Sequence, residues 1–186
     1  SDDLVIANPK RVRELIDRIK KLKRPINYSI STRFDILERL DDNLLKELKS
    51  TGCRIMGLGV ESGSDRILKL IGKNITAEKI LKGLERLKNT GILPSVSIMV
   101  GQYTETKADV MKSFKLMIKS VRTNPLIAYA FSITTPFPGS ILYDLIFAKK
   151  LVKSDEDFYK RYIAGRVGDW NQVVNLSKMS DAEVIK

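Results

Sequence analysis

Leu87-Lys88-Asn89-Thr90-Gly91, with the apolar run Pro94-Ser95-Val96-Ser97-Ile98-Met99-Val100 shortly after it, decides the fold class of this chain. The same pattern stands one unit earlier, where Leu48-Lys49-Ser50-Thr51-Gly52 precedes a second apolar run at residues 54–60. A glycine at the end of an amphipathic stretch closes a helix, and the apolar run after it predicts a buried strand. Helix and strand alternating in units of about 30 to 40 residues predict an α/β fold with parallel strands.

The same alternation extends over most of the chain. Apolar side chains at helical spacing, turn residues and capping signals indicate the remaining elements. The expected helices span residues 9–24, 41–50, 65–71, 76–89, 106–120 and 141–149. The expected strands span residues 26–31, 54–60, 94–100 and 126–134. In the helix that begins at Thr106, the expected buried face consists of Val110, Phe114, Met117 and Ile118.

The pattern changes after about residue 150. Capping signals at Ser154 and Ser180 indicate two further helices, with a glycine-containing loop between them. We therefore expect residues 1–150 to form the βα domain and residues 151–186 to form a C-terminal helical extension. Phe158, Tyr159 and Trp170 are expected to pack this extension on the sheet.

The residue counts exclude several kinds of chemistry. The 186-residue sequence contains no histidine and one cysteine, Cys53. Without histidine there is no Ser-His or Cys-His nucleophile pair and no His-ligated zinc. A single cysteine allows no internal disulfide, no Cys-only zinc site and no iron–sulfur cluster held by this chain alone. Cys53, between a glycine and a strand, is typical of a small buried hydrophobe.

The chain is basic, with 33 Lys and Arg against 22 Asp and Glu and a net charge of +11. Such a charge fits either a polyanion-binding surface or a Lys-rich solvated exterior, and the spread of the cations favours the exterior. The densest runs are Lys20-Lys21-Leu22-Lys23-Arg24 and Lys149-Lys150. No apolar run reaches the roughly 20 residues of a membrane span, and the first residues do not read as a signal peptide. We expect a cytoplasmic protein without a membrane partner.

Polar residues at the carboxyl ends of the strands are the first candidates for a site, because ligands of parallel α/β folds bind there. Glu61 is the strongest, since Gly57 and Gly59 clear its surroundings and a carboxylate can accept hydrogen bonds from two ribose hydroxyls. It could instead cap the next helix or pair with Arg33 or Arg66. The other candidates are Asp2, Asp3, Ser31, Thr32, Ser62, Gly101, Gln102, Thr104, Glu105, Thr134 and Thr135.

Two further positions keep alternatives open. Arg33 is suited to bind a carboxylate, and equally suited to pair with Asp35 or Glu61. The turn Thr135-Pro136-Phe137-Pro138-Gly139 is stiff enough to pre-organise a site, and equally typical of a plain connection between a strand and a helix.

Four stretches resemble segments of the radical SAM superfamily, in the branch whose members often carry an N-terminal cobalamin-binding domain. The most specific is Gly59-Val60-Glu61-Ser62-Gly63-Ser64, which resembles that branch's GVESGS segment. Thr32-Arg33-Phe34-Asp35 resembles its strand-end TR-x-D, and Thr135-Pro136-Phe137-Pro138-Gly139-Ser140 resembles its TPYPGT turn. Ile98-Met99-Val100-Gly101 with Glu105 resembles its IGLPGET turn, although Tyr103 and Thr104 replace the family's Pro and Gly. Order and spacing agree over roughly residues 1 to 160.

The resemblance implies part of a TIM-like (βα)6 barrel, from the end of its second strand through its sixth. In that family a Cys-x3-Cys-x2-Cys loop holds a [4Fe–4S] cluster, which cleaves S-adenosylmethionine (SAM) into methionine and a 5′-deoxyadenosyl radical. Carried over by position, Asp2 and Asp3 lie near the methionine amino group. Glu61 and Ser62 bind the ribose, and Arg33 meets the methionine carboxylate. The residues expected to border the adenine are Val100, Gly101, Thr135 and Pro136.

This sequence contains neither the cluster loop nor a strand before its first predicted helix. We therefore expect a truncated radical SAM domain with no catalytic residue or metal ligand of its own, which holds no cofactor firmly and is inactive alone. The cofactors of the parent protein are SAM, the [4Fe–4S] cluster and, as the branch suggests, cobalamin, for methylation or other C–H chemistry.

The expected partner is the N-terminal part of the barrel, and the exposed first edge of the sheet is expected to cause self-association. The substrate, a small molecule or a macromolecule, is not indicated by the sequence. The alternative function is a non-catalytic binding module of the same fold, whose basic surface binds nucleic acid or a partner protein. A small open-sheet enzyme acting alone is disfavoured, because the sequence has no P-loop and no G-x-G-x-x-G turn.

Overall fold

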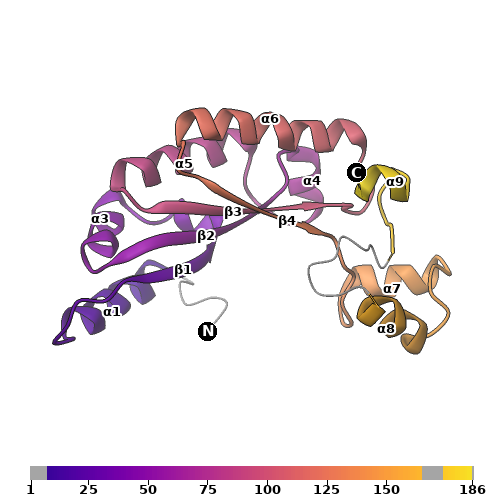
Figure 1. The fold of residues 1–186 in the computed structure, drawn as a ribbon, viewed down its shortest axis with the longest axis horizontal. Coiled ribbons are helices and arrows are strands. Elements are labelled where there is room, and N and C mark those ends of the chain that lie inside the picture. Colours follow the sequence, from indigo (N-terminus) through magenta and orange to yellow (C-terminus); the bar gives the residue numbers. More distant parts are fainter. Residues whose placement is uncertain (1–7, 165–173, 186) are drawn as a thin grey trace.

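The computed structural model describes residues 8–164 and 174–185 (Figure 1). Its centre is one sheet of four parallel strands in the order β1-β2-β3-β4. The strands are β1 (Tyr28–Arg33), β2 (Cys53–Glu61), β3 (Leu93–Val100) and β4 (Ala128–Ile133). All four predicted strands are present, and the sheet is open because β1 and β4 form its two edges. The predicted fold class, parallel βα repeats in a barrel-like sheet that does not close, is confirmed.

Helices alternate with the strands as predicted, except that the first helix ends at Lys20 instead of residue 24 and the short helix Phe34–Leu37 was not predicted. They are α1 (Pro9–Lys20), α2 (Phe34–Leu37), α3 (Asp42–Ser50), α4 (Asp65–Leu70), α5 (Ala77–Thr90), α6 (Lys107–Thr123), α7 (Ile141–Ala148), α8 (Asp155–Ala164) and α9 (Asp181–Ile185). Thr106 and Asp109 form the predicted capping box of α6, and Gly91 closes α5 with a φ of 72°. No helix within residues 8–164 and 174–185 combines the length and apolar composition needed to cross a membrane.

One face of the sheet is covered by helices and forms the main core. Figure 1 shows α3, α5 and α6 on the same side of the strands. Burial alternates along β2 and β3, as it does when only one face of a strand is packed. The strand residues buried on the covered face are Ile30, Met56, Leu58, Val60, Val96 and Ile98. They join helix residues such as Leu45, Leu48, Leu84 and Leu87 in one apolar cluster.

The opposite face stays open to solvent and carries small side chains. Each of these residues is at least partly exposed: Ser31, Gly57, Gly59, Ser95, Ser97 and Ala130. Parallel sheets are normally buried on both faces, either under helices or inside a closed barrel. The helices take the outer side here, so the open face corresponds to the interior of a barrel.

The predicted buried face of α6 is wrong. None of its four residues is buried, and Phe114 and Ile118 are 49% and 54% exposed. Polar contacts and close approach explain the difference, since Ser113 Oγ accepts a hydrogen bond of 2.8 Å from the Gly63 amide. A Cβ on Gly63 would stand 2.6 Å from Ser113 Cα, which leaves no room for a large side chain. The helix instead buries Asp109, Ser113, Leu116 and Ser120.

Residues after about 140 form a second, smaller core. Its buried members are Ile146, Val152, Phe158, Val174 and Leu176. Phe158 packs its ring edge-on against Tyr143 of α7, with ring centroids 5.0 Å apart. The prediction that Phe158 packs on the sheet is therefore wrong, because α7 offers it an aromatic partner nearer in sequence. Tyr159 is 44% exposed, and Trp170 lies outside the described residues.

Candidate functional site

An open hollow of about 340 Å³ lies over the uncovered face of the sheet. The strand register sets its floor: one row pairs Ser31, Gly57 and Ser95, and the next pairs Arg33, Gly59, Ser97 and Ala130. The interior of a closed (βα)8 barrel is filled by bulky branched side chains. Serine, glycine and alanine in those places leave space for a ligand.

Glu61 borders this hollow at the end of β2. The pairing with β3 shifts there, because Gly59 is opposite Ser97 whereas Glu61 is opposite Ile98. The φ of Glu61 is 72°, in the left-handed region that residues other than glycine rarely adopt. A bulge of this kind re-aims a side chain, and the strained backbone costs about 1–3 kcal/mol. Such strain is typical of functional positions.

Glu61 pairs with Lys73, a residue that the sequence analysis missed. Lys73 Nζ lies 3.2 Å from Glu61 Oε1 and donates a hydrogen bond of 2.9 Å to the Gly59 carbonyl. Ser97 Oγ stands 3.5 Å from the other carboxylate oxygen, Oε2. A carboxylate has about four acceptor positions, so these contacts leave room for two further donors.

Glycine at two positions keeps the space beside this ion pair open. A Cβ on Gly59 would lie 2.6 Å from Glu61 Oε1 and 3.2 Å from Lys73 Nζ. A Cβ on Gly57 would lie 2.8 Å from Ser31 Oγ. A side chain at either position would therefore push into the groups that line the hollow, which agrees with the predicted role of both glycines.

Arg33 lines the same hollow from the end of β1. Its Nε donates a hydrogen bond of 2.9 Å to Asp35 Oδ1, so the structure contains the Asp35 pair of the predicted alternatives. Burial opposes ionisation of Asp35, but the hydrogen bond from Arg33 outweighs it and lowers the pKa of Asp35. Arg33 Nη2 also donates a bond of 3.5 Å to Asp35 Oδ2. The side chain is 47% exposed, and its Nη1 group has no contact with Asp35.

Ser62 does not line the hollow. Its side chain is fully buried, and its hydroxyl accepts a hydrogen bond of 3.1 Å from the Ser64 amide. The same hydroxyl lies 3.4 Å from Ser113 Oγ on α6, which covers the other face of the sheet. Ser62 therefore anchors the backbone that follows Glu61.

A second buried network holds this strand end in place. Asp109 accepts hydrogen bonds of 2.7 Å from Ser64 Oγ and 2.5 Å from Arg66 Nη2. Burial alone would raise the pKa of Asp109, but hydrogen bonds from Arg66, Ser64 and Thr106 hold that pKa well below its usual range. Arg66 is thus committed to Asp109 and does not pair with Glu61.

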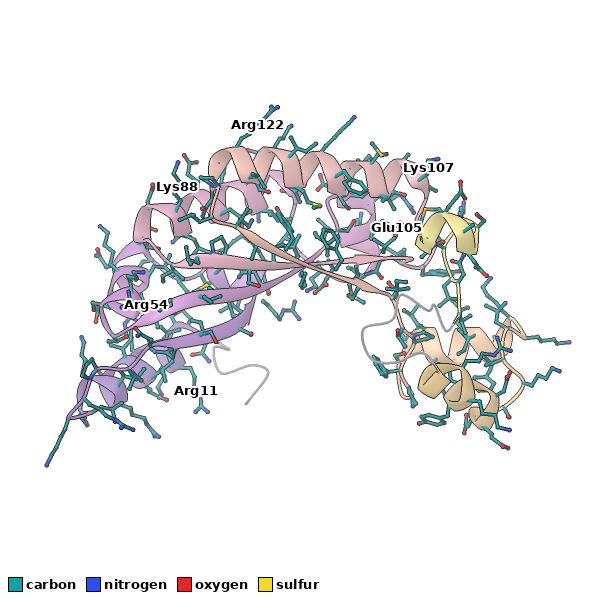
Figure 2. All side chains as sticks on the ribbon, in the orientation of Figure 1. Arg11, Arg54, Lys88, Glu105, Lys107 and Arg122 are labelled. Carbon is teal, nitrogen blue, oxygen red and sulfur yellow. The ribbon has the colours of Figure 1, made fainter. Side chains whose placement is uncertain are left out.

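The turn after β3 is held by a buried carboxyl group, Glu105 (Figure 2). Its Oε2 accepts hydrogen bonds of 2.8 Å from the Gly101 amide and 3.2 Å from the Gln102 amide. Burial raises the pKa of Glu105 to about 7, against the opposing effect of these two bonds. Its other oxygen, Oε1, has no hydrogen-bond partner in the described part of the chain.

The other predicted ligand residues are not among those that line the hollow, or they lie outside the described residues. Val100 ends β3 and Gly101 follows it, and neither lines the hollow. Pro136 is buried, and Thr135 donates a hydrogen bond of 3.4 Å to the Ile133 carbonyl. Asp2 and Asp3 lie outside the residues that the structure describes. The structure therefore brings Glu61 and Arg33 together at one hollow, and the turns after β3 and β4 contribute no residue to its lining.

Comparison with known proteins identifies the family. Residues 6–117 match the Radical SAM superfamily. The chain belongs to this superfamily. It is 32% identical over 152 residues to an uncharacterized methyltransferase of Pyrococcus horikoshii, an alignment that covers 81% of this chain and 31% of the relative. It is 30% identical over 143 residues to the tRNA-2-methylthio-N(6)-dimethylallyladenosine synthase of Sulfurihydrogenibium sp., which covers 75% of this chain and 29% of that protein.

A solved radical SAM structure shares the fold. The cobalamin-dependent SAM radical enzyme OxsB, with aqua-cobalamin and SAM bound, aligns with a TM-score of 0.52 at 18% identity. The alignment covers 82% of this chain and 21% of OxsB. The chain spans 31% and 29% of the lengths of the two relatives named above.

The radical SAM family uses SAM and a [4Fe–4S] cluster, and the hollow fits the first of these. Glu61 has acceptor positions left for hydroxyls, Lys73 and Arg33 are cations at the same hollow, and Gly59 keeps a space that a Cβ would fill. These groups match the ribose diol and the carboxylate of SAM in kind.

The described residues do not supply the ligands of a [4Fe–4S] cluster. No group of three or more Cys, His, Asp and Glu side chains there could hold a metal ion. Cys53 begins β2, at the end of the strand away from Glu61, and its side chain is buried. Burial raises the pKa of the Cys53 thiol to about 11, so it stays protonated and is a poor metal ligand.

Proposed function

We propose that this chain supplies the SAM-binding part of a radical SAM enzyme that transfers a methyl or methylthio group or performs related C–H chemistry. The observation that carries the proposal is the Glu61–Lys73 pair, set on a strained backbone beside a hollow lined by serine and glycine. SAM, when bound and reductively cleaved, supplies the family's 5′-deoxyadenosyl radical. The named relatives, a methyltransferase and a methylthio-tRNA synthase, support the class of group transferred.

Glu61 is assigned to the ribose. Lys73 contacts Oε1 and Ser97 approaches Oε2, so each oxygen keeps an acceptor position toward the hollow. Two adjacent hydroxyls on a ribose match two oxygens of one carboxylate. Hydrogen bonds to a charged acceptor contribute about 1.5–3 kcal/mol each, which makes this residue the main anchor for the nucleoside.

Lys73 and Arg33 are assigned to the methionine carboxylate. An ammonium group has three N–H donors, and Lys73 uses two of them on Glu61 and the Gly59 carbonyl. The third donor is available to a ligand in the hollow. Arg33 approaches from β1 with N–H groups that Asp35 does not occupy. Lys73 and Arg33 each have a carboxylate partner, Glu61 and Asp35, and donors left over, which suits a ligand that carries both a carboxylate and hydroxyls.

The cluster ligands are assigned to protein outside this chain, since the sequence holds one cysteine and no histidine. We expect the chain alone to bind SAM weakly and not to cleave it. The partner in this proposal is the rest of the barrel beside the edge strand β1. Self-association through that edge stays a prediction, which sedimentation velocity at micromolar concentrations tests. Cobalamin is included because OxsB is cobalamin-dependent, and no residue of this chain is assigned to it.

Equilibrium dialysis with radiolabelled SAM tests the proposal. Glu61→Gln should weaken SAM binding about tenfold or more, because it removes the charge that strengthens the ribose bonds. Glu78→Gln is the matched control, since Glu78 is an exposed carboxylate on α5 that pairs with Lys82. Equal SAM affinity for the wild type and Glu61→Gln would contradict the assignment. A wild type that binds no SAM at millimolar concentrations would support the non-catalytic binding module instead.

A further inference from the structure

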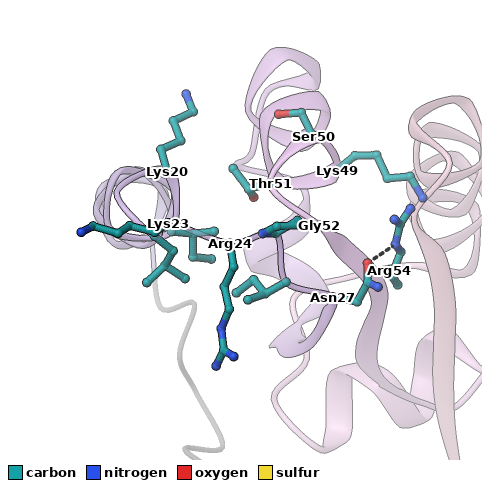
Figure 3. A pocket seen from close by; sticks show the side chains of 13 residues that line it. Lys20, Lys23, Arg24, Asn27, Lys49, Ser50, Thr51, Gly52 and Arg54 are labelled. Carbon is teal, nitrogen blue, oxygen red and sulfur yellow. Dashed lines mark hydrogen bonds between the residues drawn. The ribbon is translucent and has the colours of Figure 1, made fainter.

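A second hollow, of about 480 Å³, lies at the other end of the sheet (Figure 3). It shares no lining residue with the hollow on the open face that is proposed to bind SAM. Its walls are the end of α1, the segment of residues 21–27, and the turn between α3 and β2. Thirteen residues line it, and none of them is Asp or Glu. Five are cations: Lys20, Lys23, Arg24, Lys49 and Arg54.

Hydrogen bonds hold the start of β1 and the residue before it against the turn that leads into β2, beside this basic hollow. The Tyr28 amide donates to the Gly52 carbonyl at 3.1 Å, and the Tyr28 hydroxyl lies 2.8 Å from Thr51 Oγ1. Arg54 Nε donates a bond of 2.7 Å to Asn27 Oδ1, which Figure 3 shows as a dashed line. The hollow is therefore a fixed feature of the fold.

Gly52 has to be glycine at this position. Its φ is +104°, and a Cβ there would lie 1.9 Å from the Ile26 carbonyl oxygen. The two segments can approach this closely only because this side chain is absent.

Structural roles account for two of the five cations. Lys20 forms an ion pair of 3.0 Å with Glu47, and Lys49 donates to the Gly91 carbonyl. Both stand in or next to the last turn of a helix, where a cation offsets the helix dipole. These contacts explain why Lys20 and Lys49 are basic without any ligand.

Lys23 and Arg24 have no such explanation. They follow α1 and belong to no helix, and neither has an ion-pair partner within residues 8–164 and 174–185. Figure 3 shows their long side chains projecting from the chain beside the hollow. Arg54 uses Nε on Asn27, which leaves the outer N–H groups of its guanidinium for another acceptor. Three cations with open donors thus line a fixed hollow that has no acidic lining residue, and Lys23 extends outward from it in Figure 3.

Cations elsewhere in the described residues lie on several helices, and some of them are paired with carboxylates. The labelled cations Arg11, Lys88, Lys107 and Arg122 lie on separate parts of the molecule (Figure 2). Several other cations are neutralised by ion pairs, such as Lys82 with Glu78 and Lys160 with Glu156. The basic hollow differs from α5 and α8 in that no carboxylate lines it beside its cations.

We propose that the basic hollow binds the phosphodiester backbone of a nucleic acid, with Lys23, Arg24 and Arg54 contacting phosphates. Flexible cations that line an open hollow suit successive phosphates, and contacts of this kind position a nucleic acid without reading its sequence. The basic hollow lies where β1 and β2 begin, so a polyanion held there leaves the hollow on the open face, at the strand ends, free. The inference does not depend on the function proposed above.

Fluorescence anisotropy with a labelled RNA hairpin, and a DNA hairpin of the same sequence, tests the inference over a series of salt concentrations. The double variant Lys23→Glu/Arg24→Glu should weaken binding of both hairpins about tenfold or more. The slope of log Kd against log salt should fall by about two, one for each lost phosphate contact. The matched control is Lys115→Glu/Lys119→Glu on α6, which makes the same change in charge at exposed positions remote from the hollow.

Equal losses in the two double variants would overturn the inference, because they would show a general charge effect. No binding of either hairpin at low salt would also overturn it. Tighter binding of a poly-glutamate peptide than of the hairpins would replace the nucleic acid by an acidic protein partner. Circular dichroism checks that the variants are folded, and since the assay contains no SAM, its failure leaves the proposed SAM function standing.

Discussion

The two faces of the sheet differ although the same strands form both. Along β2, Leu58 and Val60 point into the helix-covered core, while Gly57, Gly59 and Glu61 alternate with them on the open face. The covered face carries the large apolar side chains that stabilise a fold. The open face carries the small or polar side chains that leave a hollow of about 340 Å³. The packed core and the candidate site are thus separated by the two-residue period of the strand.

The largest expected effect is a loss of folding stability, and only substitutions on the covered face should cause it. Leu58→Ala removes a side chain that is 2% exposed, and it should lower the free energy of unfolding by about 3 kcal/mol. Ser97→Ala, on the open face, should change it by less than about 0.5 kcal/mol. Urea unfolding followed by circular dichroism measures both. Similar losses for the two variants would mean that the open face is also part of the core.

The second effect concerns the buried polar network on the covered side. Asp109→Asn should lower the free energy of unfolding by about 2 kcal/mol at pH 7, because charged hydrogen bonds from Arg66 and Ser64 are weakened. The pKa of Asp109 is lower in the folded state, so its stabilisation is present above about pH 4 and is lost as the pH falls below that value. Asp17→Asn, at an exposed position, is the control. A variant that keeps the acid dependence of the wild type would assign that dependence to other groups.

Glu105 should have the opposite pH dependence. Its pKa in the folded state is about 7, above its unfolded value, so its contribution is present at low pH and is lost as the pH rises through 7. Glu105→Gln stays neutral and should be more stable than the wild type at pH 8, by about 1 kcal/mol. Unfolding curves at pH 5 and pH 8, with Glu85→Gln as an exposed control, measure the change. Parallel pH profiles for Glu105→Gln and the wild type would show that Glu105 ionises normally.

A substitution at Gly59 should lower the affinity for SAM while it changes the free energy of unfolding least. Gly59→Ala places a Cβ against Glu61 Oε1 and Lys73 Nζ, so it should reduce SAM affinity severalfold while changing the free energy of unfolding by less than about 1 kcal/mol. Gly57→Ala is the comparison, because its Cβ also enters the hollow but meets the Ser31 hydroxyl and not the ion pair, so it should reduce SAM affinity less. If Gly57→Ala reduced SAM affinity as much as Gly59→Ala, the ion pair would not be the anchor.

The strands and most helices could be predicted because their signals are local. Gly91, for example, marks the end of α5, and the apolar run after it becomes β3. The buried face of α6 could not be predicted, because it depends on the contact of Ser113 with Gly63, 50 residues away. The packing of Phe158 failed for a similar reason, since no local pattern distinguishes a partner on α7 from one on the sheet.

Site residues at the ends of strands could be predicted from the sequence. A site residue that comes from a distant loop could not. Glu61 and Arg33 end their strands, so the parallel topology alone brings them to one edge. Lys73 follows Gly72 in the loop between α4 and α5, and no periodicity links it to Glu61. Ser62 follows a strand as well, but the bulge at Glu61 and the bond to the Ser64 amide direct it into the core.

An NMR titration of the isotope-labelled chain with S-adenosylhomocysteine tests the central claim most directly, because it locates even weak binding residue by residue. We predict that amide shifts concentrate at Gly57, Gly59, Glu61, Lys73 and Ser97, around the hollow of the open face. The amides of the basic hollow, such as Lys23 and Arg54, should stay unchanged. Shifts confined to residues outside the open-face hollow, or no shifts up to about 10 mM ligand, an affinity weaker than about −3 kcal/mol, would contradict the account.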